Sequence, residues 1–184
     1  MVACFKHSEL KRLDFNIKLG RQYLLGPYFD MCKFVREHLE LNFWYEDTRY
    51  DGVKAYEITY SCIESLESIF LNLPSAKKLT IHNLVVFPTV NITVQKNYKA
   101  KQKAPIIDHI EINFDLPEEI VESYNQESMY AIHQSSMKTL MDFLFEYGVI
   151  DELQQISIDN EEMVKWTKEF FEGMELDYIT INQT

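Results

Sequence analysis

The chain has 184 residues, of which 46% are hydrophobic, and its formal net charge is −11. A chain of this length buries roughly 70% of the surface that its unfolded form exposes, so residues 1–184 can form a single domain with its own core. Three cysteines without a CxxC pair exclude a disulfide framework, and no apolar run approaches the ~18 residues of a membrane span or forms a signal peptide. We therefore expect a cytoplasmic protein that makes no membrane contact.

The charge is distributed unevenly along the sequence. The net charge is +4 over residues 1–36, −6 over 37–76, +6 over 77–107 and −15 over 108–184. A strongly acidic surface attracts basic proteins, raises their association rates and repels nucleic-acid phosphates. The alternative is that the acidic side chains only keep the protein soluble.

The first predicted elements are a helix and a hairpin. Apolar spacings of three and four residues predict a helix over residues 28–41, followed by a strand over 42–45. A turn signal at 51–52 places Trp44 and Tyr56 on the two strands of a hairpin.

Another helix and three strands are predicted in the middle of the chain. The helix opens at Ser61 or Cys62 and stops at Pro74. Alternating and β-branched residues predict strands over 78–82, 85–94 and 106–114.

The remaining sequence alternates between helical and strand patterns. The predicted order is helix, helix, strand, helix and strand, starting near residues 115, 135, 153, 159 and 176. Gly148 and Gly173 end the second and third of these helices. Asp159, with Glu162 three residues later, forms a capping box at the start of the third.

This succession predicts the α/β class, with α+β as an open alternative. We expect one mixed β-sheet of about six to eight strands, packed by three to five helices. The predicted core comprises Trp44, Tyr56, Ile58, Leu79, Ile81, Ile110, Ile112, Leu140, Leu144, Ile156, Ile158, Trp166, Phe170 and Ile179.

One spacing, apolar-x-x-apolar-x-apolar, recurs along the chain. It occurs at Leu10/Leu13/Phe15, Val53/Tyr56/Ile58, Ala76/Leu79/Ile81, Ile107/Ile110/Ile112, Leu153/Ile156/Ile158 and Leu176/Ile179/Ile181. The pattern resembles the strand signature of leucine-rich repeats. That resemblance implies parallel strands in chain order, helices on the outer side and a concave surface for protein recognition. The central positions are 43, 23, 31, 46 and 23 residues apart, whereas such arrays keep a period of about 20–29, so ordinary strands of a mixed sheet remain the alternative.

Familiar catalytic motifs are absent from the sequence. All five glycines are isolated, which excludes GxGxxG and GxxxxGK[ST], and neither GxSxG nor HExxH occurs. We therefore expect a non-enzymatic protein without a cofactor or a metal. The alternative is an enzyme with a site around His109, Glu111 and Cys62, in which the first two side chains project from one face of a strand.

A basic run precedes the acidic C-terminal segment of the chain. Its lysines and tyrosine suit a secondary contact loop, and the charge of −15 that follows argues against nucleic acid. The residues of this loop are Lys96, Tyr98, Lys99, Lys101 and Lys103.

The sequence predicts an acidic protein-binding module of the inhibitor or immunity type, which masks a basic macromolecular partner. A degenerate leucine-rich-repeat-like recognition module is the first alternative, and the enzyme described above is the second. The expected partner-binding residues are Asp151, Glu152, Asp159, Glu161, Glu162, Glu169 and Glu172.

Overall fold

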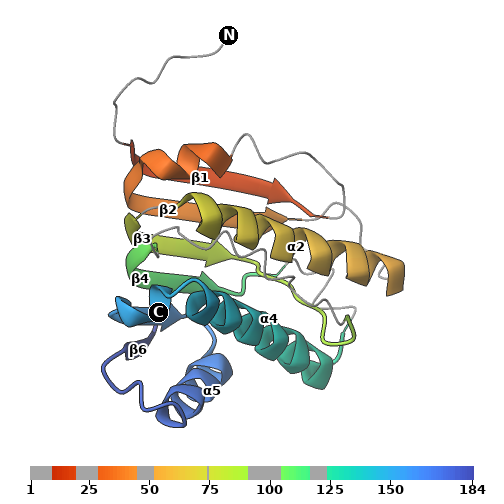
Figure 1. Ribbon diagram of the computed structural model, residues 1–184. Coiled ribbons are helices and arrows are strands. Elements are labelled where there is room, and N and C mark those ends of the chain that lie inside the picture. The colour runs from red at the N-terminus through yellow and green to blue at the C-terminus, as the bar shows by residue number, and fades with distance from the viewer. Residues whose placement is uncertain (1–9, 20–28, 45–51, 74, 91–104, 117–123) are drawn as a thin grey trace.

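A computed structural model describes residues 10–19, 29–44, 52–73, 75–90, 105–116 and 124–184. Its six strands form one sheet in the order in which they occur along the chain, and every neighbouring pair is parallel (Figure 1). The strands are β1 (Leu10–Lys18), β2 (Val35–Trp44), β3 (Ser75–His82), β4 (Ile106–Asn113), β5 (Gln155–Ile158) and β6 (Thr180–Gln183).

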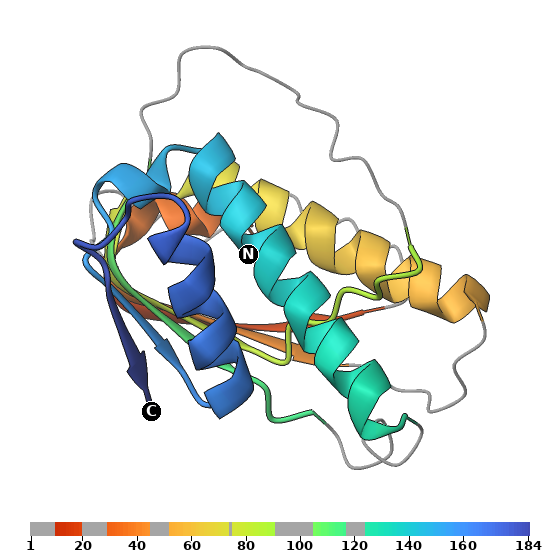
Figure 2. The ribbon, with the colours of Figure 1, turned by 90° about the horizontal axis from the view of Figure 1, so that it is seen from below.

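The α-helices lie on one face of this sheet. They are α2 (Gly52–Asn72), α4 (Gln126–Glu146) and α5 (Glu161–Glu172), and two short 3-10 helices, η1 (Asp30–Phe34) and η2 (Val149–Asp151), accompany them. Seen along the sheet, α2, α4 and α5 all lie on the same side, and no helix of the described segments covers the other side (Figure 2). The α/β class is confirmed, but the sheet is parallel throughout, whereas a mixed one was expected. Crossover segments return the chain to the same end of the sheet before each new strand, which makes neighbouring strands parallel.

The core lies between the sheet and the helices because alternate strand residues are apolar. Leu39, Leu79, Ile110 and Ile156 lie side by side across four strands, and none of them is exposed. Leu66 of α2 and Leu140 of α4 are likewise fully buried. The polar residues between these strand positions must therefore face away from the helices.

The predicted helix over residues 28–41 is wrong. Only η1 is helical there, and residues 35–44 form strand β2. In β2 the buried residues Leu39, Leu41 and Phe43 alternate with polar ones, which is the period of a strand with one buried face. The helical spacing of the apolar residues in 28–35 hid the change to a strand pattern that follows in the sequence.

The predicted hairpin is also wrong. Trp44 ends β2 and is 39% exposed, whereas Tyr56 lies on α2 and is 51% exposed, so neither belongs to the core. Helix α2 begins at Gly52, about nine residues before the expected start. Gly52 of the predicted turn is thus the first residue of a helix, and Asp51 lies outside the described residues.

Residues 84–87 are buried but form no strand, although a strand was predicted over 85–94. The backbone N–H of Val86 donates to Ser136 Oγ at 2.9 Å, and that of Phe87 donates to Thr59 Oγ1 at 3.0 Å. Hydroxyl groups of α4 and α2 therefore satisfy backbone donors that a neighbouring strand would otherwise satisfy. Residues 88–90 form a turn instead of continuing a strand, with the backbone N–H of Val90 donating to the carbonyl of Phe87 at 3.1 Å. Residues 91–94 of the predicted strand lie outside the described residues.

The helix starts in the second half also differ from expectation. Helix α4 begins at Gln126, where the Asn125 side chain accepts a hydrogen bond from the backbone of Ser128. Asn160, not Asp159, caps α5, because its Oδ1 accepts from the backbone N–H of Met163 at 3.1 Å. The helix predicted to start near residue 115 falls mostly on residues outside the described part of the chain.

None of the helices that the structure describes combines the length and the apolar character needed to cross a membrane.

The packing predicts a large difference between Leu39 and Tyr56. Leu39→Ala should lower the free energy of unfolding by about 2–5 kcal/mol, because it leaves a cavity between the sheet and its helices. Tyr56→Ala should change it by no more than about 0.5 kcal/mol, since the Tyr56 ring is largely exposed. Urea denaturation measures both, and a greater loss in the Tyr56 variant would contradict the assignment of β2 and α2.

Candidate functional site

The side of the sheet opposite the described helices, here called the open face, carries three rows of polar side chains. The strands are in register, so equivalent positions line up across them. The first row is Arg12, His38, Lys78, His109, Gln155 and Thr180; the second is Asp14, Glu40, Thr80, Glu111, Ser157 and Asn182; the third is Asn16, Asn42, His82 and Asn113.

Cations of the first row pair with carboxylates of the second. Arg12 donates to Glu40 at 2.6 Å and to Asp14 at 2.8 Å. Lys78 donates to Glu111 at 2.7 Å, and these two side chains are only 33% and 22% exposed. The ionic groups at the centre of the open face are thus held against their neighbours.

The two histidines of the first row make the same contact. Nε2 of His38 lies 2.9 Å from Thr80 Oγ1, and Nε2 of His109 lies 2.9 Å from Ser157 Oγ. In each case an imidazole bonds to a hydroxyl of the second row on the next strand. Equivalent hydrogen bonds therefore join β2 to β3 and β4 to β5.

The third row joins the same network through amides and a histidine. Asn42 Nδ2 donates to Asn16 Oδ1 at 3.2 Å. His82 lies 3.4 Å from Glu40 and 3.3 Å from the Asn113 side chain. Polar contacts therefore link β1 to β4 on the open face.

The electrostatics of the open face keep it close to neutral. Burial, followed by the charges of Arg12 and Lys78, lowers the pKa of His38, and burial with Lys78 lowers that of His109. Burial acts to raise the pKa of Glu111, but the hydrogen bond and charge of Lys78 outweigh it, so this pKa is lowered. His38 and His109 are accordingly neutral at neutral pH, beside the ionised Lys78–Glu111 pair.

The residues of the enzyme hypothesis do not converge. His109 and Glu111 share the open face, as their spacing predicts. Cys62 lies on α2, across the sheet from them, and burial raises the pKa of its thiol to about 12. Within the described ranges, no group of three or more His, Cys, Asp or Glu side chains is arranged to hold a metal ion.

The predicted partner-binding acids lie on a different surface, around η2 and α5. All of them except Asp159 are exposed. Asp159 is half-buried: its Oδ2 accepts from the backbone N–H of Phe114 at 2.8 Å, and burial raises its pKa. Lys165 and Lys168 lie among the exposed acids on α5, and Lys165 is 3.9 Å from Glu169. The basic run at 96–103 lies outside the described residues.

The sequence does contain a signal for the open face that the apolar spacing conceals. Four strands carry the related five-residue segments RLDFN, HLELN, KLTIH and HIEIN, which begin at residues 12, 38, 78 and 109. Their first, third and fifth residues form the three polar rows. The β2 copy has Arg36 in place of the leading apolar residue, and so the expected pattern misses it.

Two of the six expected copies of the apolar spacing are misplaced. The copy at Val53/Tyr56/Ile58 lies in α2, and in the last copy Ile181, rather than Ile179, pairs with Ile156. The other copies align in the register of the sheet, with Leu13, Leu79, Ile110 and Ile156 in one row together with Leu39.

Comparison with protein-family models, with curated proteins and with solved structures finds no match for this chain. The function must therefore be argued from the geometry.

The Lys78–Glu111 pair generates a prediction about pH. Replacing Lys78 with Met should raise the pKa of Glu111, because burial is then no longer opposed by the ammonium group. A Glu111 pKa that is lower in the folded than in the unfolded chain stabilises the fold at pH values above the unfolded-state pKa, and this contribution is lost as the pH falls. The Lys78 variant should therefore lose more stability, relative to the parent chain, at pH 7 than at pH 3.

Carboxyl titration by NMR and unfolding at the two pH values test this. Lys77→Met is the matched control, because Lys77 is exposed and pairs with Glu37 instead. An unchanged Glu111 pKa in the Lys78 variant would contradict the arrangement of the pair.

Proposed function

We propose that this chain is a non-enzymatic protein-recognition module that binds a protein partner through the open face of its sheet. The observation that supports this most strongly is the row arrangement: six parallel strands in chain order present in-register polar side chains on the side opposite the helices. This is the strand order that the resemblance to leucine-rich repeats implies. In such proteins the sheet surface contacts the partner.

The hydrogen-bond network suits the open face to recognition. Side chains already fixed by their neighbours, such as Glu40 and Lys78, lose little further conformational freedom when a partner binds. The donors and acceptors are spaced by the sheet itself, so a partner of complementary pattern is selected by position. The face has little net charge, and specificity there rests on hydrogen bonds and shape.

The His109–Ser157 contact does not by itself favour catalysis. The Ser157 side chain also accepts from Gln155 Nε2 at 3.0 Å, and the residue is 3% exposed. The same imidazole–hydroxyl contact recurs at His38 and Thr80. The His109–Ser157 contact is therefore better explained as part of the hydrogen-bond network than as a nucleophile and its base.

A cytoplasmic location belongs to the same proposal. Cys32 and Cys62 are free and buried, and burial raises the pKa of both thiols to about 12. Thiols of this kind are inert and are common in reducing compartments.

A bulky substitution on the open face should weaken partner binding. A partner captured from the native cell by the full chain should bind Asn42→Lys at least about tenfold more weakly, because a long side chain obstructs the third row. The control variant Glu57→Lys changes the charge more than Asn42→Lys does, but at an exposed position of α2, and it should leave the affinity for the partner unchanged.

Calorimetry with the purified partner gives both affinities, and thermal unfolding verifies that both variants are folded. Equal affinity of the parent chain and the Asn42 variant would overturn the open-face proposal.

The second candidate function is an inhibitor-type protein that masks a basic partner. It is favoured by the exposure of the C-terminal acids and by the 18 acidic and 3 basic side chains of residues 108–184. Ionic strength distinguishes the candidates, because charge contacts at an exposed surface are screened. Affinity that falls more than about tenfold between roughly 50 and 500 mM salt supports the acidic surface, and affinity that changes less than about threefold supports the near-neutral open face.

A further inference from the structure

We infer that the surface where α4 meets α5 binds a basic amphipathic segment of a partner protein. The inference rests on the second candidate function and adds to it the place of contact and the apolar anchors. The centre of this surface, here called the aromatic strip, consists of Phe145, Trp166, Phe170 and Met174.

The aromatic strip is a continuous apolar surface contributed by two helices. Phe145 of α4 is 36% exposed, and Met174, just after α5, is 46% exposed. Phe170 stacks on Trp166 with ring centroids 5.1 Å apart and meets Phe145 at 6.4 Å, and Met174 follows Phe170 by four residues. Single exposed apolar side chains are ordinary, but a connected group of them marks an interaction surface.

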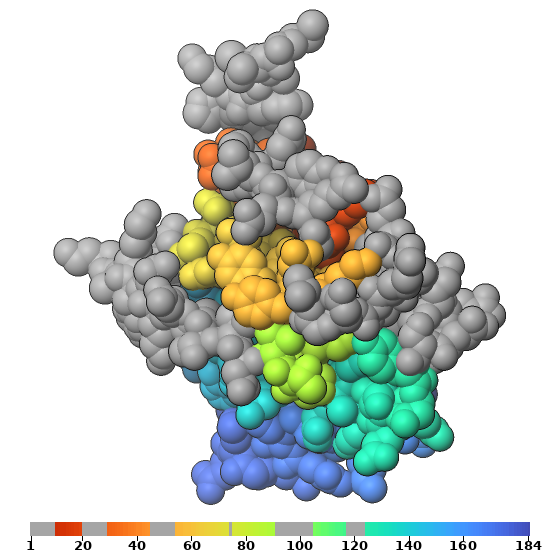
Figure 3. Space-filling model, turned by 90° about the vertical axis from the view of Figure 1, so that its right-hand side faces the viewer, coloured from red at the N-terminus to blue at the C-terminus, as the bar shows by residue number. Residues whose placement is uncertain are grey.

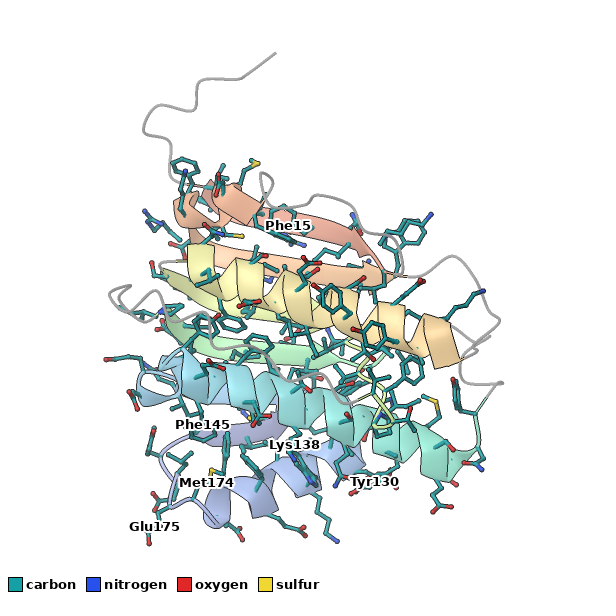
Figure 4. The ribbon with its side chains drawn as sticks, turned by 45° about the vertical axis from the view of Figure 1, so that its right-hand side comes forward. Phe15, Tyr130, Lys138, Phe145, Met174 and Glu175 are labelled. Atoms are coloured by element: carbon teal, nitrogen blue, oxygen red, sulfur yellow. The ribbon has the colours of Figure 1, made fainter. Side chains whose placement is uncertain are left out.

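α4 and α5 pack against each other, and Figure 3 shows their atoms adjoining at the end of the molecule where α4 begins. Phe145, Met174 and Glu175 lie at the same end of the α4–α5 surface (Figure 4). The strip is on the helical side and is therefore separate from the open face.

Acidic side chains border the aromatic strip. On α5, Glu162 and Glu169 stand four residues before and three residues after Trp166, which places them beside it on the helix surface. Asp142 stands three residues before Phe145 on α4. All three are exposed, and so is Glu175 beside Met174. Two lysines share this border: Lys165 lies 3.9 Å from Glu169, and Lys138 stands four residues before Asp142 on α4. Four carboxylates therefore stand beside two ammonium groups, and the border keeps a net negative charge.

This combination selects one kind of occupant. Apolar side chains of a bound helix can pack on the strip while its Arg or Lys side chains reach the bordering carboxylates and stack on the rings. A second copy of the chain would bring the same acids against one another. Membranes with anionic headgroups would be repelled for the same reason.

The probe for the test is a synthetic 18-residue helical peptide with Leu on one face and Arg and Lys on the other. Titrated calorimetrically into the full chain, it should bind the parent, and Phe145→Ser and Met174→Ser should each weaken binding at least about fivefold. Glu162→Gln with Glu169→Gln should weaken it about tenfold at low salt and have little effect at roughly 500 mM salt. The matched controls lie on α2: the single variant Tyr56→Ser and the double variant Glu57→Gln/Glu64→Gln. Both should leave the affinity for the peptide unchanged.

The inference is overturned if the parent chain does not bind the peptide, or if the α2 controls lose as much affinity as the strip variants. It is also overturned if oligo-lysine binds as tightly as the amphipathic peptide, or if the chain binds anionic vesicles more tightly than the peptide. Self-association through the strip in sedimentation experiments would overturn it as well. Met174→Ser changes an exposed residue and keeps the test meaningful if Phe145→Ser fails to fold. Because Asn42→Lys should not affect the peptide, failure of the open-face proposal remains distinguishable from failure here.

Discussion

The register of the parallel strands is the constraint on which the rest of the structure depends. Side chains alternate between the two faces of a strand, so one register places Leu39, Leu79 and Ile110 against the helices and the intervening polar residues on the open face. A slip of one residue in β2 would bury Glu40 and expose Leu39 and Leu41. The core and the candidate binding surface are consequently two results of the same pairing.

The α/β class and several elements follow from the sequence because their patterns are local. β4 and α5 have clear periodicity and lie close to where it predicts them. β2 was missed because an apolar run with helical spacing leads directly into it, and only the burial of Leu39, Leu41 and Phe43 against helices distant in sequence makes it a strand. Tertiary packing thus overrides the local spacing.

The candidate surface on the open face was missed for a related reason. Its residues are polar at alternate positions of separate strands, and they become neighbours only when the register is known. His109 and Glu111 were recognised as a pair on one face, whereas their contacts with Ser157 and Lys78 depend on pairing across strands. Net charge drew attention to the acids around α5, which lie on a second surface, because the ion pairs of the open face cancel.

The most direct test of this account is the measurement of backbone NOEs between strands in the isotopically labelled chain. The account predicts parallel-strand contacts that connect the backbones at Leu13, Leu39, Leu79, Ile110 and Ile156 in that order. NOEs that pair residues 42–45 with the segment around Tyr56 as an antiparallel hairpin, or that show another strand order, would contradict it.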